Sequence, residues 1–361
     1  MKAFFIAVLI ALLAAAAFAG YLWYSIEKPF GAIPSEGVFV EIPRGVSQRT
    51  VAHILEKSGI IRSSIAFDLF ARRHPKRSPL AGEYFFDHPL TGKEVFWKLA
   101  NGDVFLQPFT VKEGDTIFDI AHNLEAANYM KAADFLNAAR DASQVQDFAP
   151  GAKTLEGLLF PATYNLPHHA APDDLAAMMV RKFREALQQV APDRLDPLTP
   201  GTPLLSVVTL ASLVESETPD PEERPIVAGV YTNRLLQGML LQCDPTVIYA
   251  LKRADKYNPP LLLKDLRFDS PYNTYLHSGL PPGPIGNPGE SAIRAALSPA
   301  PTDFLYFVAN TQGGHFFSST LAEHNENVAK YHRLLHGEPA DPPVVEAHQT
   351  HAAGSARKGK R

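Results

Sequence analysis

Apolar residues dominate the start of the chain, where no charged side chain occurs from Ala3 to Ile26. A helix of this length would cross a bilayer, whose hydrocarbon core requires about 20 apolar residues. A cleaved signal peptide is the alternative, because Ala17-Phe18-Ala19 has the small residues of a cleavage site. The apolar run continues past that point into aromatic residues that suit a membrane boundary. We therefore expect a single-pass anchor, residues 1–26, in the inner (cytoplasmic) membrane, with the remaining chain on the extracytoplasmic (periplasmic) side.

The next pattern of polar and apolar positions occurs twice. The runs that begin at Phe39 and Phe109 each combine a β-rich stretch, a glycine turn and apolar residues at helical spacing. The pairs that correspond, at one constant offset, are Gly45 and Gly114, His53 and His122, and Leu55 and Leu124. Gly82–Phe86 has the composition of a further strand in the first copy. The sequence thus predicts two small tandem α+β units, residues 37–107 and 108–165.

Longer helical patterns extend from about Asp173 to Met239, and a strand-and-loop region follows them. Its segment Ser270–Gly289 is rich in Pro and Gly, and irregular segments of this length are usually binding loops or disordered. The aromatic and amide residues of this segment favour a binding loop. We expect a mixed α+β domain over residues 170–336, so the fold class is α+β. The polar remainder, residues 337–361, predicts a disordered tail.

One predicted helix carries a carboxylate on its apolar face. At about 100° per residue, Glu215 falls about 20° from Leu204, in the stripe that faces the core. Burial raises the pKa of a carboxyl group, which suits a general acid. The alternative is a structural role, in which Glu215 bonds a backbone amide or Arg224. Glu217 falls roughly on the opposite side of the wheel and is predicted to face solvent.

The ends of this helix are marked by residues that start and stop helices. Thr202 suits the N-cap and Pro203 the first helical position, while Pro219 cannot continue the helix. The predicted helix therefore runs from about Pro203 to Thr218.

Composition and charge exclude several function classes. The 34 Lys and Arg residues against 38 Asp and Glu residues give a net charge of -4, which does not favour a nucleic-acid partner. The single Cys243 excludes an internal disulfide and a cysteine-based zinc site. His315 and His324 lack the spacing pattern of metal ligands, so no metal is expected. No G-x-S-x-G motif occurs, and acyl transfer is unsupported.

Four long motifs carry a family resemblance. They are ASLVESET, YTNRLLQGMLLQCDPTVIYAL, YNTYLHSGLPPGPIGNPG and FVANTQGGHFFSSTLAEHN, in this order. The chain resembles the YceG-like (MltG) family of endolytic peptidoglycan transglycosylases from its apolar N-terminus to about His336. The resemblance implies that Glu215, which follows the Ala-Ser-aliphatic-aliphatic run, is the catalytic acid.

The implied reaction breaks the glycosidic bond between N-acetylmuramoyl and N-acetylglucosaminyl residues of nascent strands. The same glutamate protonates the leaving oxygen and then accepts the proton of the C6 hydroxyl, which leaves 1,6-anhydro ends and sets strand length. The implied partners are peptidoglycan glycan strands and the cytoplasmic membrane, and peptidoglycan synthases remain open as further partners. No cofactor is implied.

Residues of the later motifs are candidate substrate contacts. Amides and aromatic rings suit a sugar groove, because they offer paired donors and acceptors and flat apolar faces. The candidates are Gln242, Asp244, Tyr249, Asn273, Tyr275 and Asn287. Turn capping is the alternative for the Asp and Asn residues. The chain departs from the family pattern at Cys243, Leu158 and Ala162.

A second resemblance concerns FTVKEGDTIFDIAHNL, Phe109 to Leu124, which is similar to the start of a LysM glycan-binding domain. A spacer without a binding groove is the alternative. For the whole chain the rival functions are a hydrolytic muramidase, with Asp244 as a second acid, and a membrane-tethered peptidoglycan-binding adaptor without catalysis.

Overall fold

A computed structural model describes residues 1–167, 170–195 and 203–336. The chain divides into two compact units. The first consists of Met1–Lys112, Asp119–Ala139 and Pro161–Met178, and the second of Glu113–Phe118, Arg140–Phe160 and the residues from Met179 onward. The predicted tail, residues 337–361, lies outside the described residues.

The first unit opens with helix α1 (Lys2–Glu27), as the uncharged run predicts. It is the one helix among residues 1–167, 170–195 and 203–336 that is long and apolar enough to cross a membrane. Most of its large apolar side chains are exposed, but Ile26 near its end is 8% exposed and belongs to the core of the first unit. The end of α1 packs against α3 and α4.

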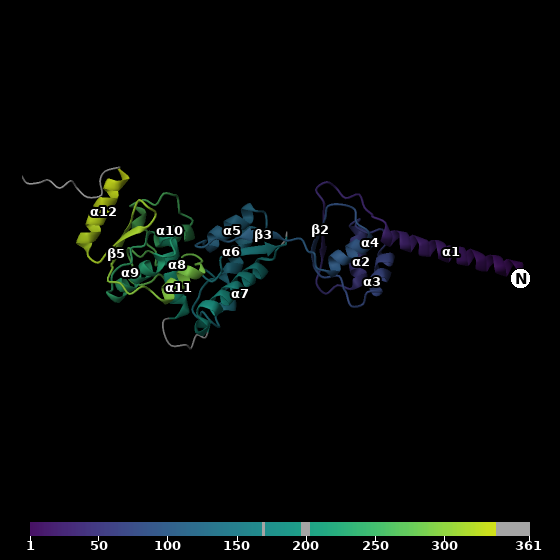
Figure 1. Cartoon of the computed structure of the whole chain (residues 1–361), viewed down its shortest axis with the longest axis horizontal. Coiled ribbons are helices and arrows are strands. Elements are labelled where there is room, and N and C mark those ends of the chain that lie inside the picture. Colours follow the sequence, from purple (N-terminus) through teal and green to yellow (C-terminus); the bar gives the residue numbers. More distant parts are fainter. Residues whose placement is uncertain (168–169, 196–202, 337–361) are drawn as a thin grey trace, which may run out of the picture. The chain divides into compact units, whose positions relative to one another are not determined.

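The first repeat has the order strand, helix, helix, strand. Its elements, with the helix that follows, are β1 (Val38–Ile42), α2 (Gln48–Lys57), α3 (Ser64–Arg72), β2 (Gly82–Phe86) and α4 (Gly92–Ala100). The two strands pair antiparallel, from Val38 opposite Phe86 to Ile42 opposite Gly82. Helices α2, α3 and α4 pack together beside this pair (Figure 1). The predicted strand Gly82–Phe86 is confirmed.

The second repeat has the same order of elements. They are β3 (Gln107–Thr110), α5 (Ile117–Ala126), α6 (Ala132–Arg140) and β4 (Thr163–Leu166). Strands β3 and β4 pair antiparallel, so the sequence repeat is also a repeat of structure. Two segments within residues 108–165, Glu113–Phe118 and Arg140–Phe160, are grouped with the second unit. The physical reason is a set of hydrogen bonds from residues 114–117 into the second unit, described below.

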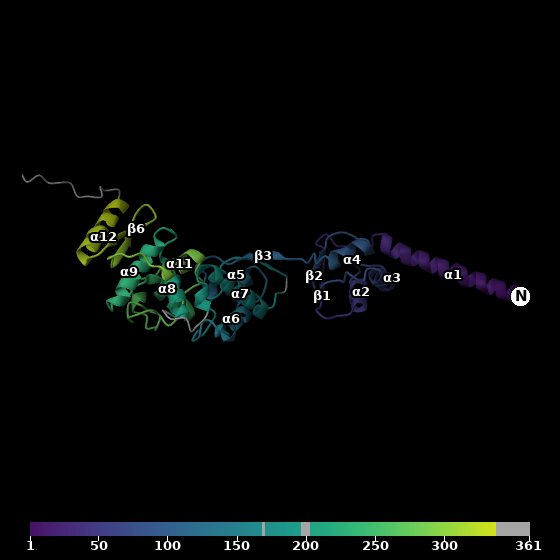
Figure 2. The same ribbon diagram turned by 60° about the horizontal axis from the view of Figure 1, so that its bottom comes forward.

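The second unit is built around helix α8 (Leu204–Glu217). Its other elements are η1 (Ser143–Val145), α7 (Pro172–Val190, which begins in the first unit), η2 (Pro192–Leu195), α9 (Arg224–Leu236), α10 (Asp244–Arg253), η3 (Asp265–Arg267), α11 (Glu290–Leu297), β5 (Tyr306–Ala309), β6 (His315–Ser318) and α12 (Leu321–Leu335). Helix α8 lies beside α11 in both views (Figures 1 and 2) and also packs against α9 and α10.

Helix α8 is covered around its circumference. Every residue from Val207 to Val214 is buried, including the polar Thr209 and Ser212. Their hydroxyl groups donate to the backbone oxygens of Leu205 and Thr209, at 2.7 Å each. A helix that is buried all round belongs to the interior of its domain. The helix begins one residue after the predicted Pro203, and the predicted cap Thr202 lies outside the described residues.

Candidate active site

Glu215 lies in the last turn of α8, with its side chain only 5% exposed. One carboxylate oxygen accepts a hydrogen bond from Nη2 of Arg224 at 2.5 Å. The other accepts the backbone N–H of Gly289, immediately before α11, at 2.9 Å. The prediction that Glu215 points into the core is confirmed. Both partners expected of a structural acid, Arg224 and a backbone amide, are also present.

Opposing effects act on the proton of Glu215. Burial is the largest effect and raises the pKa of the carboxyl group above its ordinary value, while the Gly289 N–H and the Arg224 guanidinium lower it. Glu113, whose carboxylate lies 3.6 Å from the same guanidinium, raises the pKa further. The balance leaves the pKa raised. A group that donates and then accepts a proton needs this combination of an accessible neutral form and a stabilised anion.

A cavity of about 590 Å³ lies beside the Glu113–Arg224 pair. Its lining residues are Glu113, Pro221, Pro225, Glu290, Ser291, Arg294, Ala295 and Ser298. Ligand pockets usually measure about 300–1,000 Å³, so this cavity has a suitable size. Glu113 both lines the cavity and contacts Arg224, which connects the cavity to the buried acid.

Contact between two loops holds the N–H group of Gly289 that donates to Glu215. The backbone N–H of Gly114 donates to Asn287 at 2.8 Å, and the N–H of Asn287 donates to Asp115 at 3.0 Å. A Cβ atom at Gly286 would lie 2.5 Å from the oxygen of Gly114, so the loops approach too closely for any side chain there. This contact holds the segment that ends at Gly289 in place.

Asn287 is fully buried, and its side chain completes the contact between the loops. Its Oδ1 accepts the N–H of Leu159 at 2.9 Å, and its Nδ2 donates to the backbone oxygen of Asp115 at 2.8 Å. Asn273 is fully buried as well, and its Nδ2 donates to the oxygens of Leu266 and Phe268. Both side-chain amides therefore make hydrogen bonds within the fold.

Tyr249 is 3% exposed and packs against Phe118 and Tyr272, with ring centroids 5.9 and 4.9 Å away. Burial, the largest effect, raises the pKa of its hydroxyl group. Its ring is therefore part of the packed interior.

Gln242, Asp244 and Tyr275 form the accessible part of the predicted set. Gln242 is exposed with a φ of 53°, and its backbone N–H donates to Thr274. Asp244, exposed at the start of α10, accepts the hydroxyl of Tyr275 at 2.6 Å. Within the part of the chain that the structure describes, Glu215 has no hydrogen bond or ion pair with these three residues.

The predicted solvent exposure of Glu217 is wrong. Its carboxyl accepts the hydroxyl of the buried Tyr231 at 2.5 Å and also interacts with the buried thiol of Cys243. Burial is the largest effect and raises its pKa above the ordinary value. The helical wheel failed because Tyr231 of α9 and Cys243, immediately before α10, lie against Glu217.

His315 and His324 have separate partners. Nδ1 of His315 lies 2.7 Å from a carboxylate oxygen of Glu223, which accepts the hydrogen bond, and His324 stacks on Tyr306 with ring centroids 5.2 Å apart. Among the described residues, no group of three His, Cys, Asp or Glu side chains could hold a metal ion. Sequence reasoning missed Glu113 and Gly289, which flank the two loops but lie in turn motifs that carry no chemical signal by themselves.

Substitution of Glu217 by Gln is expected to change how stability depends on pH. Because the folded carboxyl has a raised pKa, the folded state retains a proton that the unfolded state releases, and the free energy of unfolding falls as pH rises from 4.5 through the raised value. Because Gln cannot ionise, the Glu217→Gln protein should lose less stability over this pH range than wild type. Urea unfolding of the detergent-solubilised chain at about pH 4 and about pH 8 measures it.

The exposed Glu222 provides the control. Glu222→Gln should keep the wild-type dependence on pH. Identical dependence in wild type and Glu217→Gln would show that the Glu217 carboxyl is not the buried titrating group.

Comparisons with known proteins support the resemblance seen in the motifs. The sequence model of the YceG-like family matches residues 40–330. The endolytic murein transglycosylase of Bacillus subtilis (strain 168) is 34% identical over 324 residues, which cover 85% of this chain and 88% of the relative. The protein of the same name from Streptococcus pneumoniae serotype 2 (strain D39) is 28% identical over 365 residues, covering 92% of this chain and 65% of the relative.

A solved structure is also similar. The crystal structure of a YceG-like protein from Listeria monocytogenes has 32% sequence identity and a TM-score of 0.54, and the match covers 81% of this chain and 99% of that chain.

Proposed function

Because this chain belongs to the YceG-like family, we propose that it is an endolytic murein transglycosylase, a lyase that cuts peptidoglycan glycan strands internally. The reaction breaks the bond between C1 of an N-acetylmuramoyl residue and the oxygen of the next N-acetylglucosaminyl residue. The leaving oxygen takes a proton, and the C6 hydroxyl of the muramoyl residue closes onto C1 as it loses its own proton. The products have a 1,6-anhydro end, and no water is consumed.

The buried carboxyl of Glu215 is the observation that carries this proposal. A glycoside hydrolase usually places two carboxyl groups across the scissile bond, one as acid and one as nucleophile or base. Here Glu215 acts in both steps. Its raised pKa favours the neutral acid, and Arg224 and the Gly289 N–H stabilise the carboxylate that accepts the second proton. The neighbouring Glu217 bonds Tyr231 instead.

We assign substrate contact to Gln242, Asp244 and Tyr275, because their side chains are at least partly accessible. Tyr249, Asn273 and Asn287 are buried and support these loops from within.

Glu215→Gln preserves size and removes the titratable proton. We expect cleavage of purified sacculi to fall about 10²- to 10⁴-fold, while glycan binding is retained. Mass spectrometry of the soluble products counts 1,6-anhydro ends. The exposed Glu222→Gln serves as the matched control and should cleave at the wild-type rate. Wild-type amounts of anhydro ends from the Glu215→Gln protein would contradict the assignment of Glu215 as the catalytic acid.

The same digestion separates the rival functions. A muramidase adds one water to each cleaved bond, and a binding adaptor leaves strand length unchanged. Products with the mass of the anhydro form are expected from the lyase alone.

We further propose that α1 is a retained, single-pass anchor with the catalytic unit on the extracytoplasmic side. The exposed apolar side chains of α1 require an apolar environment, and its end packs into the core of the first unit. Membrane fractionation should recover the mature protein with its original N-terminus still attached. A soluble product that begins at Gly20, immediately after the small-x-small site, would contradict the anchor.

The second repeat is proposed to hold glycan in the manner of the LysM-like modules that its sequence resembles. Amide hydrogen exchange of the full-length Glu215→Gln protein, with and without soluble glycan strands, tests this role. We expect slower exchange in residues 119–139 and none of this effect in the corresponding part of the first repeat, which serves as the internal control. Unchanged exchange in residues 119–139 would leave the second repeat as a spacer.

A further inference from the structure

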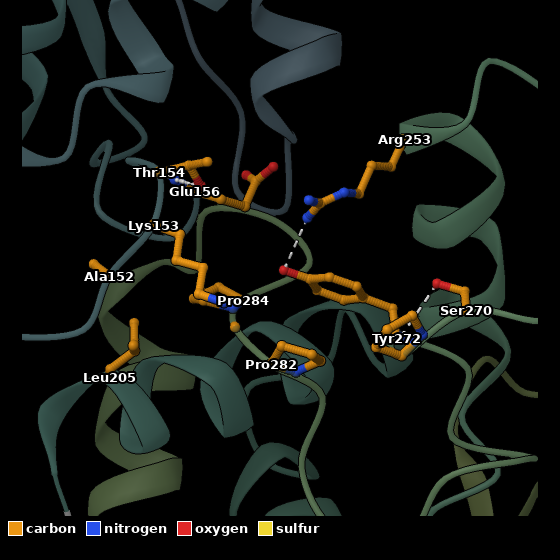
Figure 3. Close-up of a pocket in the computed structure, with 12 residues that line it drawn as sticks. Ala152, Lys153, Thr154, Glu156, Leu205, Arg253, Ser270, Tyr272, Pro282 and Pro284 are labelled. Carbon is orange, nitrogen blue, oxygen red and sulfur yellow. Dashed lines mark hydrogen bonds between the residues drawn. The ribbon is translucent and has the colours of Figure 1, made fainter.

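A second cavity, of about 210 Å³, lies in the same unit and shares no lining residue with the cavity beside Glu113. Its walls come from residues 152–156, from Arg253 at the end of α10, and from residues 270–272 and 282–284 of the long irregular loop (Figure 3). Its lining residues are Ala152, Lys153, Thr154, Glu156, Leu205, Arg253, Ser270, Pro271, Tyr272, Pro282, Gly283 and Pro284. The proposed reaction makes no use of these residues.

Two cationic side chains line this cavity from opposite sides. Lys153 and Arg253 flank the hydroxyl of Tyr272 (Figure 3). Nη1 of Arg253 donates to this hydroxyl at 3.3 Å, and the guanidinium lies 5.3 Å from the centre of the tyrosine ring. Within residues 1–167, 170–195 and 203–336, neither Lys153 nor Arg253 makes an ion pair with a carboxylate.

Glu156, the one acidic residue that lines this cavity, is hydrogen-bonded to groups in the cavity wall. Its side chain is buried, and its carboxylate oxygens accept the N–H of Ile117 at 3.1 and 3.2 Å. Oε1 also accepts Nδ2 of Asn287 at 3.3 Å. These donors stabilise the charge of Glu156 locally. The two cations and the hydroxyl groups of the cavity remain to bind an anionic group.

The cavity is coupled through the backbone to the proposed catalytic residue. Its wall at Pro284 is followed by Ile285, whose N–H donates to Oγ of Ser212 in α8 at 3.0 Å. The same loop then reaches Asn287 and Gly289, which donates to Glu215. A Cβ atom at Gly157 would lie 2.4 Å from Pro284, so this wall is closely packed. A ligand here would sit at a fixed position relative to the acid.

We propose that this cavity binds a carboxylate of the stem peptide that peptidoglycan strands carry on their muramoyl residues. The inference rests on the proposed function, because it specifies which part of that substrate the cavity recognises. A cation pair around an aromatic hydroxyl binds a carboxylate by charge-assisted hydrogen bonds, whereas an uncharged sugar leaves both charges unpaired. The enzyme would then favour strands that retain their peptides over strands from which an amidase has removed them.

Steady-state cleavage of these two kinds of strand tests the proposal. We expect wild type to show a KM about tenfold lower for peptide-bearing strands. Lys153→Gln/Arg253→Gln should raise that KM about tenfold, change kcat little and leave cleavage of peptide-free strands unaffected. The exposed Lys264→Gln is the matched control and should behave as wild type. Equal KM values of wild type for both strands would overturn the proposal.

A second measurement does not depend on the folding of a variant. Calorimetric titration compares wild-type binding of the free stem peptide with binding of the same peptide after its carboxyl groups are amidated. Weaker binding after amidation supports the proposal, and equal binding or no binding of either peptide overturns it. Failure of wild type to cleave any strand would instead contradict the proposed transglycosylase activity, so the two failures are distinguishable.

Discussion

The contact between residues 114–115 and the loop around Asn287 determines the geometry of the site. Reciprocal backbone hydrogen bonds join Gly114 and Asp115 to Asn287, and the buried amide of Asn287 adds bonds to Leu159 and Asp115. A buried backbone N–H or C=O group without a hydrogen-bond partner destabilises the folded state. Neither loop can therefore move away without breaking several of these hydrogen bonds. Gly289 follows two residues later, and its N–H therefore reaches Glu215 at a fixed distance.

This contact also explains why the second repeat is divided between the two units. Residues 107–110 and 163–166 form the same kind of antiparallel pair as the corresponding strands of the first repeat. The glycine turn after the first strand of the second repeat makes contacts with distant residues of the chain. At Gly114 the turn supplies the N–H that meets Asn287, and Glu113 beside it faces Arg224. The second repeat thus contributes Glu113 and Gly114 to the surroundings of Glu215.

Helix α8 places two carboxyl groups in a low-dielectric interior, with different consequences. Glu215 meets a guanidinium and a backbone N–H, which stabilise its anion. Glu217 meets a phenol and a thiol in the interior. Burial raises the pKa of both groups, but only Glu215 has a cation within 4.0 Å among the described residues. The environment of Glu215 therefore suits a group that cycles between its protonated and ionised forms.

The sequence by itself determined the features that depend on local pattern. The uncharged run predicted α1, the constant offset predicted two copies of a strand, a glycine turn and a helix, and the helical period placed Glu215 toward the interior. The motifs identified the family, and the sequence also named Arg224 and a backbone amide as partners of a structural Glu215.

The tertiary structure decided what lies on the other faces of each element. Periodicity finds the most apolar face of a helix, but it does not show whether neighbouring helices cover the remaining faces. That is why the environment of Glu217 was predicted wrongly. Similarly, residue type made Asn273 and Asn287 candidates for sugar contact, and only the structure shows that both amides are buried and donate to backbone oxygens. Such contacts join residues far apart in the chain, and they exist only once the helices and loops have packed.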